Sequence, residues 1–281
     1  MPIFEVHHHG PVTEIVMGPS LFGRPVFPFR AYMVDGLLID TGPPINQAQM
    51  AAFLREHRVE QVVNTHHHED HAGLNAMINQ QLGLTPLVHE SAVSLLADLP
   101  PIQRYRKLTW RPAANSRTAA IGAVVETNRY RFRVLHTPGH ADDHVVLHEP
   151  DQGWLFSGDL FIADRLKLLR REEDPHVMLE SVALTLRSDF ETLYCAHRGI
   201  VADGHAAMGR KHANMAAFRD EVRRLHAMGL GPVEILHRLM GREDRVMAWL
   251  SEGDFTRLNL VEACLPGWMG PPKASPRPRS T

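Results

Sequence analysis

The sequence predicts an α/β fold with a helical C-terminal extension, and three observations support this expectation. Short apolar runs alternate with segments of helical periodicity, so the pattern switches between periods of two and 3.6. Two β-rich stretches, residues 2–115 and 120–200, are followed by helical periodicity over 203–265. A hydrophobic content of 44% in 281 residues is enough for a substantial core. We expect an α/β domain over 1–205, a helical extension over 206–265 and a disordered Pro-rich tail over 266–281.

The first stretch opens with short strands. IFEV at 3–6 and TEIVM at 13–17 precede FRAYMVDG and LLIDTG, where Asp35-Gly36 is a hairpin signal between two apolar runs. The next elements are a helix over 45–57, a strand over 61–65, a helix from His71 that stops at Gly83, and a strand over 85–89. The order of elements is therefore β-α-β-α-β.

The second stretch repeats the strand pattern after an insertion. Residues 90–120 are expected to be helical or irregular, and they carry the basic residues Arg104, Arg106, Lys107 and Arg111. Strands are expected over 129–140, 144–150, 153–159 and 191–197, with a helix over 175–187. The helical region that follows is broken around Gly229–Pro232 and at Gly241.

Composition narrows the classes of function. The formal net charge of -2 gives no overall attraction to nucleic acid or to an anionic membrane, so we expect neither as a partner. The chain has no run of about 18 apolar residues and no secretory signal pattern. Two cysteines, Cys195 and Cys264, are too few for a disulfide framework. Together these features predict a cytoplasmic protein.

Histidine is the unusual residue, with 19 copies, and neutral imidazole is the commonest metal ligand in proteins. The run at residues 7–9 lies in the first expected strand and lacks acidic partners at ligand spacing. We interpret it as a feature of an edge strand. Residues 65–71, THHHEDH, contain H-x-H-x-D-H between an apolar strand and a helix. Strand-end loops of this kind are where sites are built.

The spacing in this loop indicates two neighbouring metal ions. His66 and His68 are alternate residues of an extended turn and can reach one ion, while Asp70 and His71 can reach a second. Three further candidates each end an apparent strand, in an order that would line one face of a sheet sandwich. They are His140 in HTPGH, Asp159 in FSGD and His197 in CAHRG.

The segments THHHEDHAG, HTPGHADDH, LFSGD and AHRG resemble the successive metal motifs of the metallo-β-lactamase superfamily, over about residues 10–205. The resemblance implies an αββα sandwich with two metal ions. It further implies that Asp40, in LLIDTG, helps to orient the ligand loop, although capping a turn is an alternative role. By position, it assigns His66, His68 and His140 to the first ion, Asp70, His71 and His197 to the second, and Asp159 to both.

The ligand types imply hydrolytic chemistry. Imidazole and carboxylate without thiolate suit Zn²⁺, and the same set can hold Fe or Mn. Two such ions would bridge a water and lower its pKa toward neutrality, so that hydroxide is the nucleophile and no Ser or Cys is needed. The expected catalytic residues are Asp159, as the bridge, and Asp70, as a group that can also move protons.

Missing features argue against some branches of this superfamily. Glyoxalase II has a Gly-Cys-Gly stretch soon after the bridging aspartate, and persulfide dioxygenases share a similar element; this chain has none. Acyl-homoserine lactonases place a tyrosine where this chain has Ile162. The branch with HTPGHxDDH and a helical extension, which includes an endoribonuclease group and a quinolone-signal thioesterase, is more similar. We expect a small ester, thioester or lactone as substrate.

Several alternatives stay open. The same ligands would serve an endoribonuclease or phosphodiesterase, a mononuclear-iron oxidoreductase acting on a thiol, or a binding protein without turnover. Arg165 and Lys167 could meet an anionic substrate group, although a solvated charged segment is the simpler interpretation. The 90–120 insertion could be a lid, and the C-terminal helices could cover the pocket or mediate homodimerisation. We interpret His89, His144 and His148 as core or surface histidines.

Overall fold

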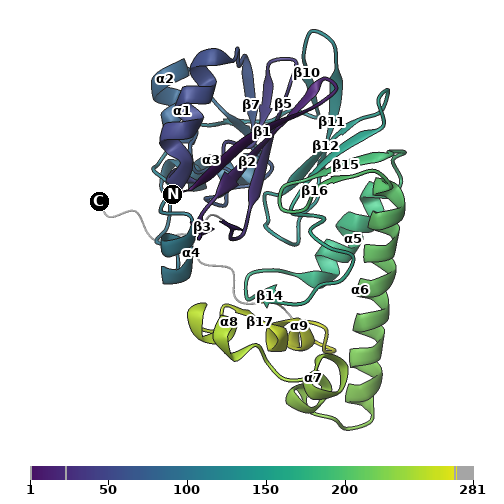
Figure 1. Ribbon diagram of the computed structural model, residues 1–281. Coiled ribbons are helices and arrows are strands. Elements are labelled where there is room, and N and C mark those ends of the chain that lie inside the picture. The colour runs from purple at the N-terminus through teal and green to yellow at the C-terminus, as the bar shows by residue number, and fades with distance from the viewer. Residues whose placement is uncertain (1, 23, 269, 271–281) are drawn as a thin grey trace.

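The computed structural model describes residues 2–22, 24–268 and 270. Two β-sheets face one another, and helices cover the outer face of each sheet (Figure 1). A smaller unit made by the C-terminal residues lies below them in this view. Within the described residues, no helix has the length and apolar character needed to cross a membrane.

The first sheet contains the N-terminal strands. Its first four strands pair antiparallel with one another, and its last four pair in parallel, so the fourth strand belongs to both sets. The turn from Asp35 to Gly36 has positive φ at both residues, as a two-residue hairpin turn requires, so the hairpin signal is confirmed. In spatial order the strands are β1 (Ile3–His9), β2 (Val12–Gly18), β5 (Phe29–Val34), β6 (Leu37–Ile39), β7 (Gln61–Val63), β8 (Leu87–Val88) and β9 (Ala119–Ala120).

The second sheet is built from the later strands. Neighbouring strands run antiparallel except for the parallel pair β13 and β15, which is joined through helix α5 (Pro175–Thr185). The expected hairpin of residues 144–150 with 153–159 is confirmed. In spatial order the strands are β10 (Val124–Glu126), β11 (Arg131–His136), β12 (Val145–Glu149), β13 (Trp154–Gly158), β15 (Thr192–Cys195) and β16 (Gly199–Val201).

Three buried clusters hold the four layers together. Successive residues of a strand point to opposite faces, so Leu37 and Ile39 enter the cluster between the sheets while Leu38 enters the cluster under the first helices. In the second sheet, Tyr194 faces the first sheet and Cys195 faces helix α5. Both faces of these strands are buried, which explains why the sequence shows nearly continuous apolar runs there.

The helices divide between the two outer faces. The first sheet is covered by α1 (Gln47–Glu56), α2 (Asn75–Leu82) and α3 (Glu90–Ala97), after the short η1 (Pro44–Asn46). The second sheet is covered by α5 and by the N-terminal half of α6 (Gly204–Ala227). This is the αββα sandwich that the resemblance implied.

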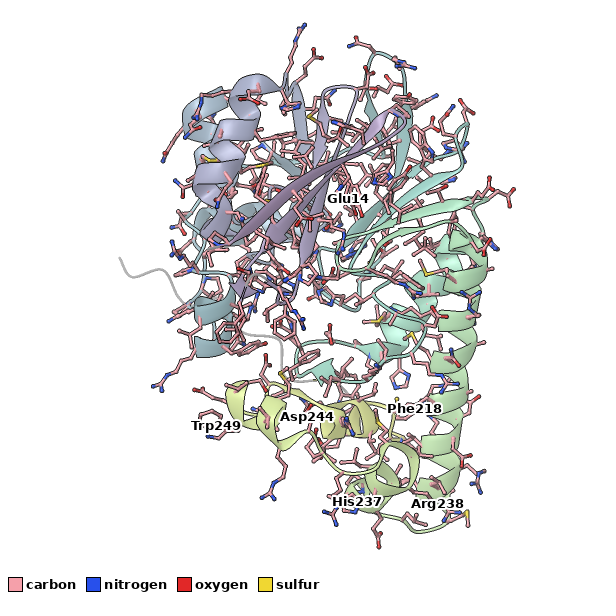
Figure 2. All side chains as sticks on the ribbon, in the orientation of Figure 1. Glu14, Phe218, His237, Arg238, Asp244 and Trp249 are labelled. Atoms are coloured by element: carbon pink, nitrogen blue, oxygen red, sulfur yellow. The ribbon has the colours of Figure 1, made fainter. Side chains whose placement is uncertain are left out.

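Helix α6 connects the sandwich to the C-terminal unit. Its residues Met208 and Met215 pack with α5, whereas Val222 and Leu225 pack with α7 (Pro232–Met240) and α9 (Arg257–Ala263). Phe218 on α6 points toward this unit (Figure 2). Because one continuous helix contributes to both cores, the division at residue 205 stays a prediction.

The C-terminal extension is mainly helical, as expected, but it also carries a strand that the sequence did not indicate. After α8 (Arg245–Leu250), β17 (Phe255–Thr256) pairs antiparallel with β14 (Leu169–Arg170). Strands of two residues have no periodicity to detect, and the hairpin of β3 (Ser20–Leu21) and β4 (Arg24–Pro25) was missed for the same reason. Of the tail predicted to be disordered, 266–281, residues 269 and 271–281 lie outside the described residues, whereas Trp268 is described and packs against the cluster around Leu260.

One expected helix starts later than its sequence pattern suggests. Periodicity indicated a helix from His71, but α2 begins at Asn75. The His71 carbonyl accepts hydrogen bonds from the Thr41 backbone amide at 2.7 Å and from Asn64 Nδ2 at 3.2 Å. Because these tertiary contacts occupy that carbonyl, residues 71–74 form turns instead. The expected stop at Gly83 is confirmed by its left-handed conformation at the C-cap.

A buried ion pair fastens the 90–120 insertion to the histidine loop. Arg106, on α4 (Arg104–Thr109), donates from Nε to Glu69 Oε1 at 2.7 Å and from Nη2 to the other carboxylate oxygen. Both side chains are buried. Of the four basic residues noted in this insertion, Arg106 is buried, while Arg104, Lys107 and Arg111 are exposed.

We expect Arg106→Ala to lower the free energy of unfolding by ~3–5 kcal/mol, because it leaves the Glu69 carboxylate buried without a partner. Urea unfolding followed by circular dichroism measures this. Arg104→Ala is the matched control on the same helix: its side chain is 87% exposed and lies 3.7 Å from Glu252, so the change should stay within ~0.5 kcal/mol. Equal losses in the two variants would contradict the anchoring role.

Candidate metal centre

The histidine loop follows β7 and is held in shape by Asp40, at the end of β6. Asp40 Oδ1 accepts a hydrogen bond from the Thr65 backbone amide at 2.7 Å, and Oδ2 accepts from Thr65 Oγ1 at 2.9 Å. His71 Nδ1 donates to Asp40 Oδ2 at 2.8 Å. Asp40 itself has a φ of 64°, which is uncommon for a residue with a side chain. Asp40 therefore orients the loop and fixes which nitrogen of His71 faces the centre.

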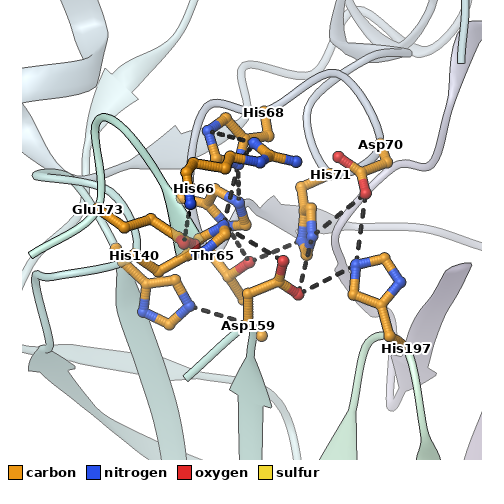
Figure 3. Close-up of polar contacts among 12 residues, drawn as sticks. Thr65, His66, His68, Asp70, His71, His140, Asp159, Glu173 and His197 are labelled. Carbon is orange, nitrogen blue, oxygen red and sulfur yellow. Dashed lines mark hydrogen bonds and ion pairs between the residues drawn. The ribbon is translucent and has the colours of Figure 1, made fainter. Parts of the chain in front are cut away.

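The first group of donor atoms combines the loop with the second sheet (Figure 3). His66 Nε2 lies 2.8 Å from His68 Nδ1, and His140 Nε2 lies 3.1 Å from the same His68 atom. Asp159 Oδ2 is 3.2 Å from His140 Nε2. Three imidazole nitrogens and one carboxylate oxygen therefore converge on one small volume.

The second group lies on the other side of the same carboxylate (Figure 3). Asp159 Oδ1 is 3.3 Å from His71 Nε2 and 3.3 Å from His197 Nε2. Asp70 Oδ2 is 3.4 Å from His197 Nε2 and 3.9 Å from His71 Nε2. Because each oxygen of Asp159 faces a different group, this carboxylate joins the two.

The donor atoms fit divalent metal ions. All seven side chains predicted from the sequence are brought together, in three overlapping groups whose ligand atoms lie within 4.8 Å of one another. Six are buried, and the His197 side chain is 20% exposed. His71 Nε2 and Asp159 Oδ1 are buried without a hydrogen-bond partner among the described residues. Leaving such atoms unsatisfied is costly, and a bound cation would satisfy both.

The protonation states suit cation binding. Burial holds the pKa of His66 and of His68 well below the ordinary value, so both rings are neutral. Burial opposes ionisation of Asp159, but His197 and His71 outweigh it and hold the pKa of this carboxyl well below its usual range. The first group therefore offers neutral imidazole lone pairs beside a carboxylate, the forms that bind metal. In the second group burial is outweighed by nearby carboxylates, which raise the pKa of His71 and of His197, so a cation bound there would displace their protons.

The glycine of the HTPGH segment lets His140 lie against helix α5. Gly139 has a φ of 125°, which residues with a side chain rarely adopt, and a Cβ there would lie 2.4 Å from the Met178 backbone nitrogen. The Gly139 carbonyl also accepts a hydrogen bond from the Asp174 amide at 2.7 Å. The segment therefore needs glycine because the backbone passes so close to the helix.

Glu173 is a site residue that sequence reasoning missed. Its Oε1 accepts from His140 Nδ1 at 2.5 Å, and its Oε2 accepts from the Arg170 backbone amide at 2.8 Å. The glutamate is buried. It directs the other ring nitrogen of His140 toward the donor group. No spacing rule could have found it, because it lies in the charged run RREED, 33 residues from its partner.

The structure corrects one interpretation of the remaining histidines and confirms two. His144 is part of the support for the centre: its Nε2 accepts from the Asp159 backbone amide at 3.0 Å, and burial lowers its pKa to about 3. His148 is a buried core histidine that contacts the Asp189 carbonyl. His89 caps helix α3 and stacks on His136 near the surface.

Arg165 and Lys167 are not among the residues of the donor groups. Both are exposed and line a cavity whose described wall contains none of the seven predicted ligands. A different cation, Arg170, lies beside the first group, with Nη1 3.3 Å from His68 Nε2. The sequence therefore pointed to Arg165 and Lys167 as candidate contacts for an anionic substrate group, but not to Arg170, the cation beside the first group of donor atoms.

Comparisons with known proteins agree with this geometry. A family model described as "Metallo-beta-lactamase superfamily" matches residues 31–205. A hydroxyacylglutathione hydrolase from Maricaulis maris (strain MCS10) is 30% identical over 165 residues, 58% of this chain and 56% of that protein. One from Legionella pneumophila (strain Lens) is 27% identical over 124 residues, 43% of this chain and 42% of that protein. The chain thus spans about half the length of these relatives.

A solved structure supports the fold assignment. A beta-lactamase domain protein from Burkholderia ambifaria superposes with a TM-score of 0.70 over 92% of this chain and 86% of that chain, at 17% identity. Similarity at this level of identity concerns the fold alone.

We expect Asp159→Ala to remove metal from both donor groups while the protein stays folded, because each group loses its shared oxygen. Elemental analysis gives the metal content per chain, and far-ultraviolet circular dichroism reports the fold. Asp151→Ala, in an exposed turn, is the control and should keep its metal. Two ions retained in Asp159→Ala would rule out the shared carboxylate.

We expect Glu173→Gln to weaken metal binding by ~10-fold or more, because a neutral acceptor makes His140 a poorer ligand. Competition with a chromogenic chelator measures the affinity. Glu180→Gln, on the exposed side of α5, makes the same chemical change away from the centre and should leave the affinity within ~2-fold. If both variants behave alike, Glu173 has no positioning role.

Proposed function

The chain belongs to the metallo-beta-lactamase superfamily, and from that premise we propose that it is a metal-dependent hydrolase of small ester, thioester or lactone substrates. The observation that carries the proposal is the Asp159 carboxylate, whose two oxygens face two separate groups of buried ligand atoms. Such an arrangement suits two cations held side by side. It supplies a hydrolytic centre without a Ser or Cys nucleophile.

We propose zinc as the metal at both positions, because the donor atoms are imidazole nitrogens and carboxylate oxygens. When bound, the two ions would activate a water molecule and polarise the attacked carbonyl oxygen. The first position would be held by His66, His68 and His140, the second by Asp70, His71 and His197, and both by Asp159.

The protein's own groups would prepare these ligands. Asp40 and Glu173 accept hydrogen bonds from the outer N–H groups of His71 and His140, which leaves the inner nitrogens to bind the ions. Asp70 lies 3.4 Å from His197, the most exposed of the seven side chains. We propose that Asp70 also moves protons when the second ion is weakly held.

Within this class we favour an acyl thioester. Arg170 carries a permanent positive charge beside the first group, and its side chain is 15% exposed, so it could pair with a departing thiolate or a substrate carboxylate. The relatives from Maricaulis maris and Legionella pneumophila bear a name that denotes hydrolysis of a glutathione thioester. This chain lacks the Gly-Cys-Gly stretch, so the proposal covers the thioester class and not the glutathione carrier.

We also propose that the protein works in the cytoplasm. Cys195 and Cys264 are free thiols, both buried, which fits a reducing compartment.

The test has two parts. Metal content per chain is measured on protein purified without added metal, and turnover is measured with a panel of chromogenic thioester, ester, lactone, phosphodiester and β-lactam substrates. We expect about two zinc ions per chain and turnover confined to the thioester, ester and lactone members. Asp159→Ala should lower kcat by at least ~100-fold. His7→Ala, in the exposed part of β1, is the control and should match the wild type.

Two outcomes would overturn the proposal. Turnover of the phosphodiester alone would move the chain to the nuclease and phosphodiesterase branch. A single iron per chain with no hydrolysis of any member would point to oxygen chemistry on a thiol.

A further inference from the structure

The cavity lined by Arg165 and Lys167 lies between the outer helices of the second sheet and the C-terminal unit. Its volume is about 510 Å³, which is typical of small-molecule pockets. It is bounded by residues 165–167, the N-terminal half of α5, the middle of α6, the end of α7, and α9. Its described wall shares no residue with the donor groups of the metal centre.

The interior of this cavity is apolar. Leu179 from α5, Met215 from α6 and Leu260 from α9 line it and are buried in the surrounding clusters. Phe218 and Leu239 add partly buried apolar surface, and Phe218 points from α6 toward the C-terminal unit (Figure 2). A ligand would therefore gain free energy by placing an apolar chain here.

The edge of the cavity carries two cations without partners. Arg165 and Lys167 are exposed, and neither forms an ion pair or side-chain hydrogen bond within the described part of the chain. Between them, Leu166 packs on the clusters of the second sheet and of α9. The segment 165–167 thus packs one partly buried apolar side chain against these clusters and leaves two positive charges at the edge of the cavity.

The other charged groups in the described lining are already engaged. Arg219 pairs with Asp220 at 2.8 Å, and Arg257 donates to the carbonyls of Met240 and Arg242. Glu221, the acidic residue of this lining, pairs with Arg224 at 2.7 Å. The charge available to a ligand is therefore positive.

A neighbouring pocket provides a contrast. It also includes Arg165 and Lys167, together with Arg198 and Arg210. Those two arginines both pair with Asp164, at 3.2 and 2.9 Å, and neither of them lines the apolar cavity. Arg210 is therefore a cation on the same face that does not line the apolar cavity.

We propose that this cavity is a second binding site, for an anionic amphiphile with a carboxylate head and a single aliphatic chain. The chain lies among Leu179, Met215 and Phe218, and the carboxylate pairs with Arg165 and Lys167. This site is independent of the metal centre and of the proposed hydrolysis.

The experiment is isothermal titration calorimetry of the full chain with decanoate, both metal-loaded and after chelation. We expect one decanoate per chain in both states, with similar affinity. The Arg165→Ala/Lys167→Ala double variant should weaken binding by at least ~10-fold, since two charged contacts are lost. Hexanoate should bind more weakly by roughly fourfold for each methylene no longer buried.

Four controls separate the effects of charge, of cavity shape and of bound metal on the affinity for decanoate. Arg210→Ala lowers the charge of the same face and should leave the affinity within ~2-fold. Ala217→Trp, at an exposed position of the lining, should block the chain and weaken binding. Asp159→Ala, as a second metal-poor form, should bind decanoate like the wild type. Uncharged 1-decanol should bind at least ~10-fold more weakly than decanoate.

Three results would overturn the proposal. Loss of decanoate binding on chelation would place the carboxylate on the metal ions. Equal effects of Arg210→Ala and the double variant would show a general charge effect. Equal affinities for 1-decanol and decanoate would show that Arg165 and Lys167 do not bind the carboxylate. Because the readout is binding, each result is distinguishable from a failure of the proposed hydrolase activity.

Discussion

The Asp159 carboxylate, set between three imidazole rings, is the contact on which the arrangement of this protein depends. One oxygen faces His140 and the other faces His71 and His197. His71 belongs to the first sheet's loop, while the other three residues follow strands of the second sheet. The donor groups therefore exist only while the two sheets keep their relative position. That position is set by the apolar cluster between them, because close-packed side chains resist sliding.

Around this contact, three of the seven ligands are held by residues from different elements. Asp40 follows β6 and holds the loop, Glu173 precedes α5 and holds His140, and His144 holds the Asp159 backbone. Ligand rings need such partners because an imidazole can present either nitrogen, and the partner on one side decides which lone pair remains on the other. Gly139 allows the close approach that joins α5 to this support.

The C-terminal unit is joined to the sandwich at several points. Helix α6 contributes to both cores, and β17 pairs with β14, next to Glu173. The buried pair of Glu69 and Arg106 links the histidine loop to α4. The segment from Asp159 to α5 therefore borders the metal centre on one side and the apolar cavity on the other. This position explains how one fold can carry two separate binding sites.

The sequence by itself determined the order of the longer strands and helices, the α/β class and the seven clustered residues. Strand periodicity and motif spacing are local properties, so H-x-H-x-D-H and the strand-end His140, Asp159 and His197 could be read directly. Only the tertiary structure decided the residues that act across long separations. Glu173, Arg106 and His144 meet their partners through packing, and Arg165 and Lys167 face a cavity rather than the metal centre. The His71 helix start was also decided by tertiary hydrogen bonds, because local propensity is weaker than satisfying a buried carbonyl.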